Sequence, residues 1–305
     1  MGVRSFFQVA SVMALAVGGS QGLRIIQSND DGWAELYLRS FYDALSNSGH
    51  DVVVSAPAEN KSGRGALDED PEPRTDACEY DSCPANTNAT TGTNATDNHF
   101  NWVNSYPATS MRYGIDSIAP GVWGGAAPEF AVAGPNVGSN LYLQNHFSGT
   151  VGAACYAAGT AGIPAIAFSG LSGGRLAWDA TPVPERSLVY ADLAANLTNA
   201  IIDSGAPYLP DGIFLNVNLP AVEGACTTAS AFSFVMSRID PRTVFSSDDV
   251  ETCGSTELPT ELSVVGTDGC YVSVSVGQCS DKTTADAENQ GIVLDKIGSL
   301  LTCLP

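Results

Sequence analysis

Short apolar runs alternate with amphipathic segments along the first part of the chain. The run 23–26 predicts a strand, and aromatic and leucine residues that recur at helical spacing over 33–45 predict a helix. Residues 47–49 end this helix, and the β-branched run 51–55 predicts a second strand. A strand, a helix and a strand of these lengths form a βαβ unit with parallel strands and a right-handed crossover.

The same alternation continues after residue 129. The expected elements are strand 129–133, loop 134–148, a helix of small residues at 149–158, strand 165–169, helix 187–204 and strand 213–218. From Cys226 onward the chain is rich in strand patterns and cysteine, with clean alternation over 269–276, and a terminal helix is expected at 292–301. We expect an α/β fold followed by a strand-rich extension, residues 226–280.

The first residues have the pattern of a secretory signal peptide. Arg4 supplies a positive charge, residues 6–17 are apolar, and small residues follow at 18–20. A core helix or a membrane anchor is the competing interpretation, but the run is too short to span a bilayer, and no later segment is long and apolar enough. We expect residues 1–22 to be removed and the mature chain, 23–305, to be a soluble, secreted protein with no membrane contact.

Residues 68–105 interrupt the regular pattern. Residues 85–96 have almost no apolar content and contain two N-x-T acceptor sites for glycosylation, at Asn88 and Asn94. We interpret residues 68–105 as a glycosylated surface insertion. A third acceptor site lies at Asn196, and Asn60 is formally a fourth.

Eight cysteines form an even set, and a secreted chain would place them in an oxidising compartment. Disulfides are therefore expected. Spacing alone favours only the pair Cys78–Cys83 and leaves the connectivity of the other six open. No spacing is typical of a structural zinc site.

The chain carries a formal net charge of −20, from 13 basic and 33 acidic side chains. This sign argues against a surface that binds nucleic-acid polymers. It also means that a phosphate site must attract anions locally, through a metal ion and backbone N–H groups.

Two adjacent carboxylates, Asp30 and Asp31, follow the first predicted strand. The carboxyl ends of strands are where α/β sheets bind ligands, and hard divalent cations prefer carboxylate oxygens. The ordinary alternative is a turn in which an aspartate caps the following helix, and this motif alone favours that alternative.

Polar residues also follow the 129–133 strand and begin the small-residue helix. Asn136 and Asn140 lie in a glycine-containing loop that can offer an amide oxygen to a metal and backbone N–H groups to an anion. Ser148 and Thr150 begin the helix, whose free N–H groups suit a phosphate. An ordinary loop and an ordinary Ser148 N-cap are the alternatives, and each motif alone favours them.

Taken together and in order, the motifs resemble those of the SurE-like survival-protein phosphatases, over nearly the whole mature chain. The matching segments are Ser28–Gly32, Gly49–Pro57, Lys61–Gly63 with Gly65, Tyr106–Ser110, Ala133–Asn136, the N-x-G-x-N…S-G-T spacing of Asn136–Thr150, Gly162–Ala167, Leu215–Pro220 and Thr267–Val274. The resemblance implies a Rossmann-like, three-layer α/β/α domain with a mostly parallel sheet and a strand-rich C-terminal extension used in homodimer contacts.

The resemblance also implies an activity: hydrolysis of nucleoside 5′- or 3′-monophosphates and other phosphomonoesters with a divalent metal, Mg²⁺ or Mn²⁺, with Ca²⁺ a further candidate. Matched by position, the metal ligands would be Asp30, Asp31, Ser62 and Asn136, and the phosphate ligands would be Asn140, Ser148, Gly149 and Thr150. As a catalytic residue, Asp30 would either activate water or attack phosphorus. We favour water activation as a hypothesis.

Several positions depart from the family pattern. Val137 stands where the family has an arginine, Pro135 replaces an isoleucine, and Ser110 replaces an aspartate. These changes bear on substrate specificity, so two alternatives stay open: a broad-specificity secreted acid phosphatase that scavenges phosphate, and a non-catalytic protein that binds a phosphate ligand. His146 is a candidate acid for the leaving group, although a packed or exposed histidine is the favoured interpretation.

Overall fold

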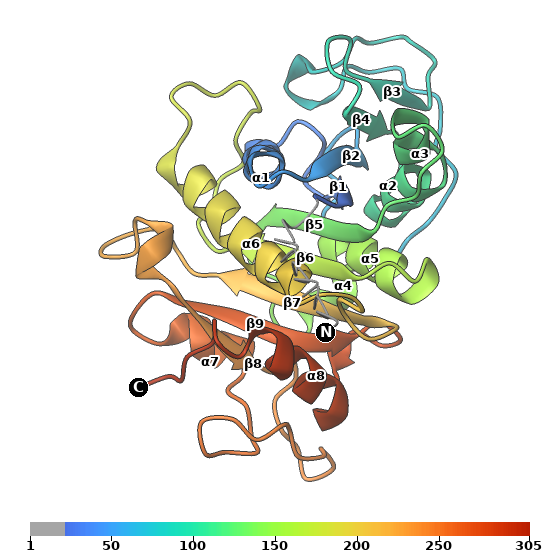
Figure 1. Cartoon of the computed structure of the whole chain (residues 1–305). Coiled ribbons are helices and arrows are strands. Elements are labelled where there is room, and N and C mark those ends of the chain that lie inside the picture. The colour runs from blue at the N-terminus through green and yellow to red at the C-terminus, as the bar shows by residue number, and fades with distance from the viewer. Residues whose placement is uncertain (1–21) are drawn as a thin grey trace, which may run out of the picture.

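The structure, a computed structural model that describes residues 22–305, is built around one ten-stranded sheet (Figure 1). The strands are β1 (Arg24–Ser28), β2 (Asp51–Pro57), β3 (Thr91–Thr93), β4 (Phe100–Val103), β5 (Phe130–Val137), β6 (Ala165–Gly170), β7 (Ile213–Leu219), β8 (Ser233–Ser237), β9 (Tyr271–Gln278) and β10 (Thr283–Thr284). The predicted signal peptide, residues 1–22, lies outside the described residues except for Gly22, and it stays a prediction.

Eight α-helices accompany the sheet within residues 22–305. They are α1 (Leu36–Asn47), α2 (Pro107–Tyr113), α3 (Ala119–Val122), α4 (Gln144–Phe147), α5 (Gly149–Cys155), α6 (Glu185–Asp203), α7 (Glu261–Gly266) and α8 (Ala287–Ile297). The shorter helical segments are η1 (Glu79–Asp81), η2 (Gly114–Ile118), η3 (Tyr156–Thr160) and η4 (Ala229–Ala231). Because η3 follows α5 directly, the predicted small-residue helix continues beyond Cys155.

Parallel pairing dominates the sheet. Its order is β10-β9-β7-β6-β5-β1-β2-β4-β3, and β8 pairs with β9 outside this path. The pairs β1–β2, β1–β5, β2–β4, β5–β6, β6–β7 and β8–β9 are parallel, which confirms the mostly parallel sheet. The chain first adds strands on one side of β1 and then, from β5, on the other. The boundary between β1 and β5 is the kind of switch point where α/β sheets bind ligands.

Helices cover both faces of the sheet, as Figure 1 shows. On one face α1 and α6 pack on the strands, and the Phe41 ring of α1 meets the Phe168 ring of β6 edge to face, with centroids 5.2 Å apart. On the other face Met111 of α2 and Val151 of α5 lie in a second buried cluster with many alanines. This arrangement confirms the three-layer α/β/α fold.

The segment 68–105 differs from the predicted surface insertion at its carboxyl end. Its strand β4 pairs in parallel with β2, and Phe100 and Trp102 of β4 are buried beside the Cys78–Cys83 disulfide, which forms as predicted. The predicted insertion was therefore partly wrong, because its last residues extend the main sheet. Three apolar or aromatic residues after a long polar stretch carry too weak a pattern to show this.

Two predicted boundaries also differ. The predicted loop 134–148 starts as a continuation of β5, past a bulge between Ala133 and Asn136, and contains α4. The terminal helix begins at Ala287 rather than 292, because the Asp286 side chain caps it by accepting a hydrogen bond from the Asn289 amide.

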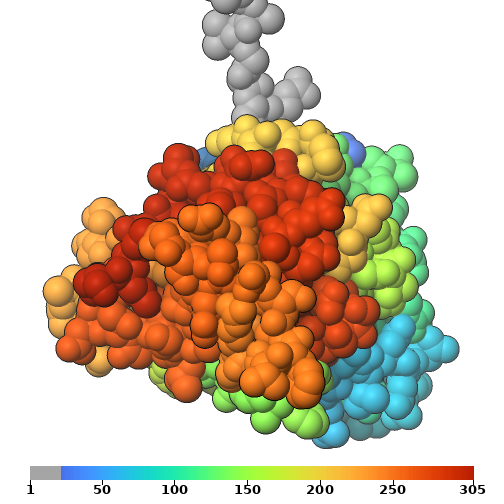
Figure 2. Space-filling view, turned by 90° about the horizontal axis from the view of Figure 1, so that it is seen from below, coloured from blue at the N-terminus to red at the C-terminus, as the bar shows by residue number. Residues whose placement is uncertain are grey.

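The C-terminal extension, residues 226–280, belongs to the same sheet, because β9 pairs antiparallel with β7. Figure 2 shows residues of the C-terminal part, in orange to red, over much of the face seen from below. Two further disulfides tie this part of the chain, Cys226–Cys270 and Cys253–Cys303.

Two cysteines depart from the expectation that all eight form disulfides. Cys155 and Cys279 carry free thiols. Cys155, at the end of α5, and Cys279, directly after β9, pack as small apolar side chains against the same cluster, and burial raises the pKa of the Cys155 thiol.

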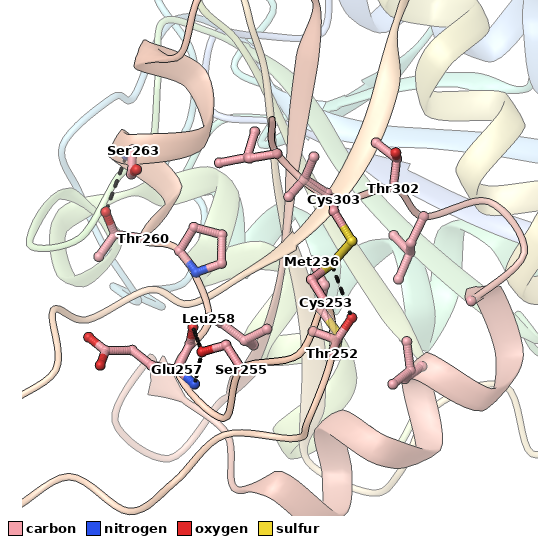
Figure 3. Close-up of a pocket in the computed structure, with 16 residues that line it drawn as sticks. Met236, Thr252, Cys253, Ser255, Glu257, Leu258, Thr260, Ser263, Thr302 and Cys303 are labelled. Atoms are coloured by element: carbon pink, nitrogen blue, oxygen red, sulfur yellow. Dashed lines mark hydrogen bonds between the residues drawn. A yellow bond between two sulfur atoms is a disulfide. The ribbon is translucent and has the colours of Figure 1, made fainter.

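A cavity of about 600 Å³ opens between the C-terminal extension and residues 294–304 (Figure 3). Its lining is mainly apolar and includes Met236 and Leu258 beside the Cys253–Cys303 bond. None of the predicted site residues lines it. The predicted site therefore lies elsewhere, at the carboxyl end of β1.

Candidate active site

Asp30 and Asp31 lie in the turn that follows β1. Asn29 fixes this turn: its side chain accepts a hydrogen bond from the Gly32 amide at 3.1 Å and donates one to the Gly32 carbonyl at 2.9 Å. Gly32 has φ +113°, a left-handed conformation that favours glycine. Both aspartate side chains are only 2% exposed. The turn therefore buries two carboxyl groups at the ligand-binding edge of the sheet.

Asp30 contacts the start of α5. Its carboxyl group accepts a hydrogen bond from the Thr150 hydroxyl at 2.7 Å and one from the Gly149 amide at 3.2 Å. A Cβ atom on Gly149 would lie 2.8 Å from the Asp30 Cβ, so only glycine allows this approach. Burial raises the pKa of Asp30, and the hydrogen bonds from Thr150 and Gly149 oppose that rise.

Asp31 contacts the two neighbouring loops. Its carboxyl group accepts hydrogen bonds from the Val137 amide at 2.7 Å and the Asn60 side chain at 3.1 Å. Burial raises the pKa of Asp31 well above its usual range, and the adjacent Asp30 charge raises it further. Two buried carboxyl groups that repel each other are an arrangement that a bound cation would stabilise.

Ser62 and Asn136 come from these two loops. The Lys61 amide donates to the Asp30 carbonyl at 2.7 Å, which brings the Ser62 loop against the turn, and Ser62 itself is exposed. The Asn136 side-chain nitrogen donates to the Gly138 carbonyl at 2.7 Å, so the side-chain oxygen is the atom that could bind a metal. All four predicted metal ligands thus lie on segments that contact one another.

The donor set fits a hard divalent cation. Carboxylate, amide and hydroxyl oxygens are the ligands that Mg²⁺, Mn²⁺ and Ca²⁺ prefer. Within residues 22–305, no group of three or more His, Cys, Asp and Glu side chains is placed to hold a metal. A metal at this turn would therefore depend on Asp30 and Asp31 together with neutral oxygen ligands.

The predicted phosphate ligands lie on two segments. Ser148 caps α5, since its hydroxyl accepts a hydrogen bond from the Val151 amide at 3.1 Å, which is the ordinary role considered for it. Gly149 and Thr150 both bond to Asp30, so the start of α5 and the aspartate turn form one unit. Asn140 is buried, and its side chain donates to the Ser169 hydroxyl at 2.7 Å. His146 is exposed, in agreement with the favoured interpretation.

A basic residue beside the turn could not be found from the sequence. Arg175 donates a hydrogen bond to the Asp31 carbonyl at 3.1 Å and pairs with Glu79, on the loop closed by the Cys78–Cys83 disulfide. Arg175 lies 144 positions from Asp31 in a glycine-rich loop with no motif of its own. It supplies a cation near the site, although Val137 replaces the arginine of the family loop.

The family model for "Survival protein SurE" matches residues 25–240, which include both aspartates, the 136–150 segment, strands β2 to β8 and helices α1 to α6. The chain belongs to the SurE family. Among its relatives, an "Acid phosphatase" from Yarrowia lipolytica is 32% identical over 281 residues, which are 83% of this chain and 78% of that protein.

A "5′-nucleotidase SurE" from Gloeobacter violaceus is also 32% identical to this SurE-family chain, over 203 residues, which are 66% of this chain and 65% of that protein. Among solved structures, the SurE protein from Aquifex aeolicus superposes with a TM-score of 0.58 at 22% identity, covering 84% of this chain and 93% of that one. At this identity the structural likeness shows that the two chains share a fold.

Proposed function

We propose that this SurE-family chain is a phosphomonoester hydrolase that uses a divalent metal at Asp30 and Asp31. The observation that carries the proposal is the contact between the paired carboxyl groups and the start of α5, in which Thr150 and Gly149 bond directly to Asp30. In this proposal the carboxyl groups would hold a cation beside a helix N-terminus, and the ester phosphate would lie between the two. The names of the two relatives, an acid phosphatase and a 5′-nucleotidase, support this reaction class.

Different residues would bind the metal and the phosphate. Asp30 and Asp31, with the oxygens of Ser62 and Asn136, would hold the metal, and Asn140, Ser148, Gly149 and Thr150 would receive the phosphate. When bound, the metal would neutralise phosphoryl oxygens and lower the pKa of water. Asp30 would orient and deprotonate the attacking water, because its carboxyl group is held from one side by Thr150 and Gly149.

Nucleoside monophosphates are the proposed substrates, and a broad-specificity acid phosphatase is the second candidate. The second candidate is favoured by the relative from Yarrowia lipolytica, which matches more of the chain than the Gloeobacter violaceus nucleotidase does. Comparing kcat/KM for AMP and for a simple aryl phosphate separates the two. A clear preference for AMP supports the nucleotidase, and equal values support the acid phosphatase. If neither AMP nor the aryl phosphate is hydrolysed, the remaining candidate is a non-catalytic protein that binds a phosphate ligand.

We also propose that the protein is secreted and glycosylated. Three disulfides suit an oxidising compartment. Asn88 and Asn196 are exposed and Asn94 is partly exposed, so all three acceptor sites are accessible. No helix in residues 22–305 combines the length and apolarity needed to cross a membrane. A mobility shift after enzymatic deglycosylation of the protein secreted by a eukaryotic host, lost in the triple Asn→Gln variant, tests this proposal.

A further inference from the structure

Asn140, a predicted phosphate ligand, is held by a buried polar network that sequence motifs do not explain. Its amide donates to the Asn218 side chain at 2.9 Å, and its carbonyl accepts from the side chains of Asn216 at 2.8 Å and Asn218 at 3.0 Å. Both of these asparagines lie on β7. The backbone of Asn140, in the loop after β5, is therefore fixed by side chains of β7, which lies two strands from β5 in the sheet.

The network ends on a carboxyl group of the C-terminal extension. Glu261 is the first residue of α7, and it follows Thr260, whose hydroxyl caps this helix by accepting from the Ser263 amide at 3.2 Å (Figure 3). Its side chain accepts a hydrogen bond from Asn216 at 2.6 Å and one from the Tyr142 amide at 3.2 Å. Glu261 is 1% exposed. The Glu261 side chain thus holds the Asn216 side chain, which positions Asn140, and also the backbone amide of Tyr142 in the same loop.

The carboxyl group also sets the orientation of Asn216. The Asn216 side-chain nitrogen has two hydrogens and lies near three acceptors: Glu261 at 2.6 Å, the Asn140 carbonyl at 2.8 Å and the Asn145 side chain at 3.3 Å. The shortest contact is to Glu261, and a hydrogen directed at Glu261 leaves the second for the Asn140 carbonyl. Without this acceptor the Asn216 side chain loses its shortest hydrogen bond and can turn toward Asn145, and the Tyr142 amide loses its partner.

We propose that Glu261 is a positioning residue for the phosphate site, fixing the segment from Asn140 to Ser148 through Asn216 and the Tyr142 amide. This inference rests on the proposed phosphomonoesterase activity. It gives the C-terminal extension a part in the reaction, because Glu261 then supports the site from outside the 25–240 region of the family model. Glu35, another buried acid, belongs to the cluster around Arg175 and bonds to the Leu176 amide.

The test measures substrate kinetics and competitive inhibition by inorganic phosphate for Glu261→Ala, Glu261→Gln and the control Glu257→Ala. Loosening the segment should lower kcat/KM and raise the inhibition constant of phosphate by on the order of 10- to 100-fold in Glu261→Ala. Glu261→Gln keeps one acceptor for Asn216 but turns a donor toward Tyr142, so an intermediate effect is expected. Glu257 lies four residues before Glu261 and is exposed, so Glu257→Ala should have the same kcat/KM and the same inhibition constant as the wild type.

The outcomes separate the two proposals. A wild-type protein that hydrolyses no phosphomonoester contradicts the proposed function, whatever the variants do. An active wild type with unchanged phosphate inhibition in folded Glu261→Ala overturns the positioning role. If Glu261→Ala does not fold, Glu261→Gln decides, and an unchanged inhibition constant in that variant overturns the inference. A merely structural role would lower the amount of folded enzyme without changing the inhibition constant.

Discussion

The buried carboxyl group of Glu261 predicts a specific dependence of stability on pH. Burial raises the pKa of Glu261 from its ordinary value of 4.5 to about 8, so the native state holds this proton more tightly than the unfolded state does. The stability contributed by the protonated group is complete below about pH 4.5. It is lost progressively as the pH rises to about 8.

The magnitude follows from these two pKa values. Native-state stability falls by about 1.4 kcal/mol for each pH unit between them. Between pH 5 and pH 8 the loss through this one group is therefore about 3 kcal/mol. Glu261→Gln cannot ionise, so it lacks this loss while keeping nearly the same volume. Its stability relative to the wild type should rise with pH by the same amount.

The assay is urea denaturation of both proteins at several pH values between 5 and 8. Only the difference between the two free energies of unfolding is used, because the other titrating groups are common to both proteins. Glu257→Gln, at an exposed position, serves as the control and should show no such trend. A difference between Glu261→Gln and the wild type that stays constant from pH 5 to pH 8 would refute the reasoning.

Two further predictions concern the contacts of α5. Gly152→Ala should cost about 1–3 kcal/mol of stability and lower activity, because its Cβ atom would lie 2.0 Å from the Gly65 carbonyl in the loop that follows Ser62. Thermal unfolding measures this effect, and Gly121→Ala, which would meet nothing within 4 Å, is the control; equal losses in both would contradict the contact. Thr150→Val removes the hydrogen bond that lowers the pKa of Asp30, so the acidic limb of the pH–rate profile should move to higher pH. An acidic limb at the same pH in Thr150→Val and the wild type would show that the Thr150 hydrogen bond does not set the pKa of Asp30.

The regular part of the fold could be predicted from the sequence, because each strand there is a continuous apolar run next to a helix of clear periodicity. Strand β4 was not predicted, because Phe100 and Trp102 follow a long polar stretch and become buried only when β4 pairs with β2. The turn with Asp30 and Asp31 could be located from the sequence because both residues directly follow one strand, and its role as a metal site stays a prediction.

Residues that reach the site from far along the chain could not be predicted. Glu261 looks like an ordinary acidic residue in the first turn of a helix, where such residues are common and exposed. Its burial depends on β7, about 45 positions earlier, which no local pattern encodes. Arg175 likewise reaches Asp31 only through the folding of a glycine-rich loop.

The most direct test of the account is the hydrolysis of AMP before and after removal of metal with EDTA, with Asp30→Asn, Asp31→Asn and the exposed control Asp192→Asn measured beside the wild type. We expect EDTA to abolish activity and added Mg²⁺ or Mn²⁺ to restore it, since the buried acid pair would hold the cation. Each substitution at the pair should cost on the order of 100-fold or more, and Asp192→Asn should cost nothing. Full activity in Asp30→Asn and Asp31→Asn would contradict the central claim.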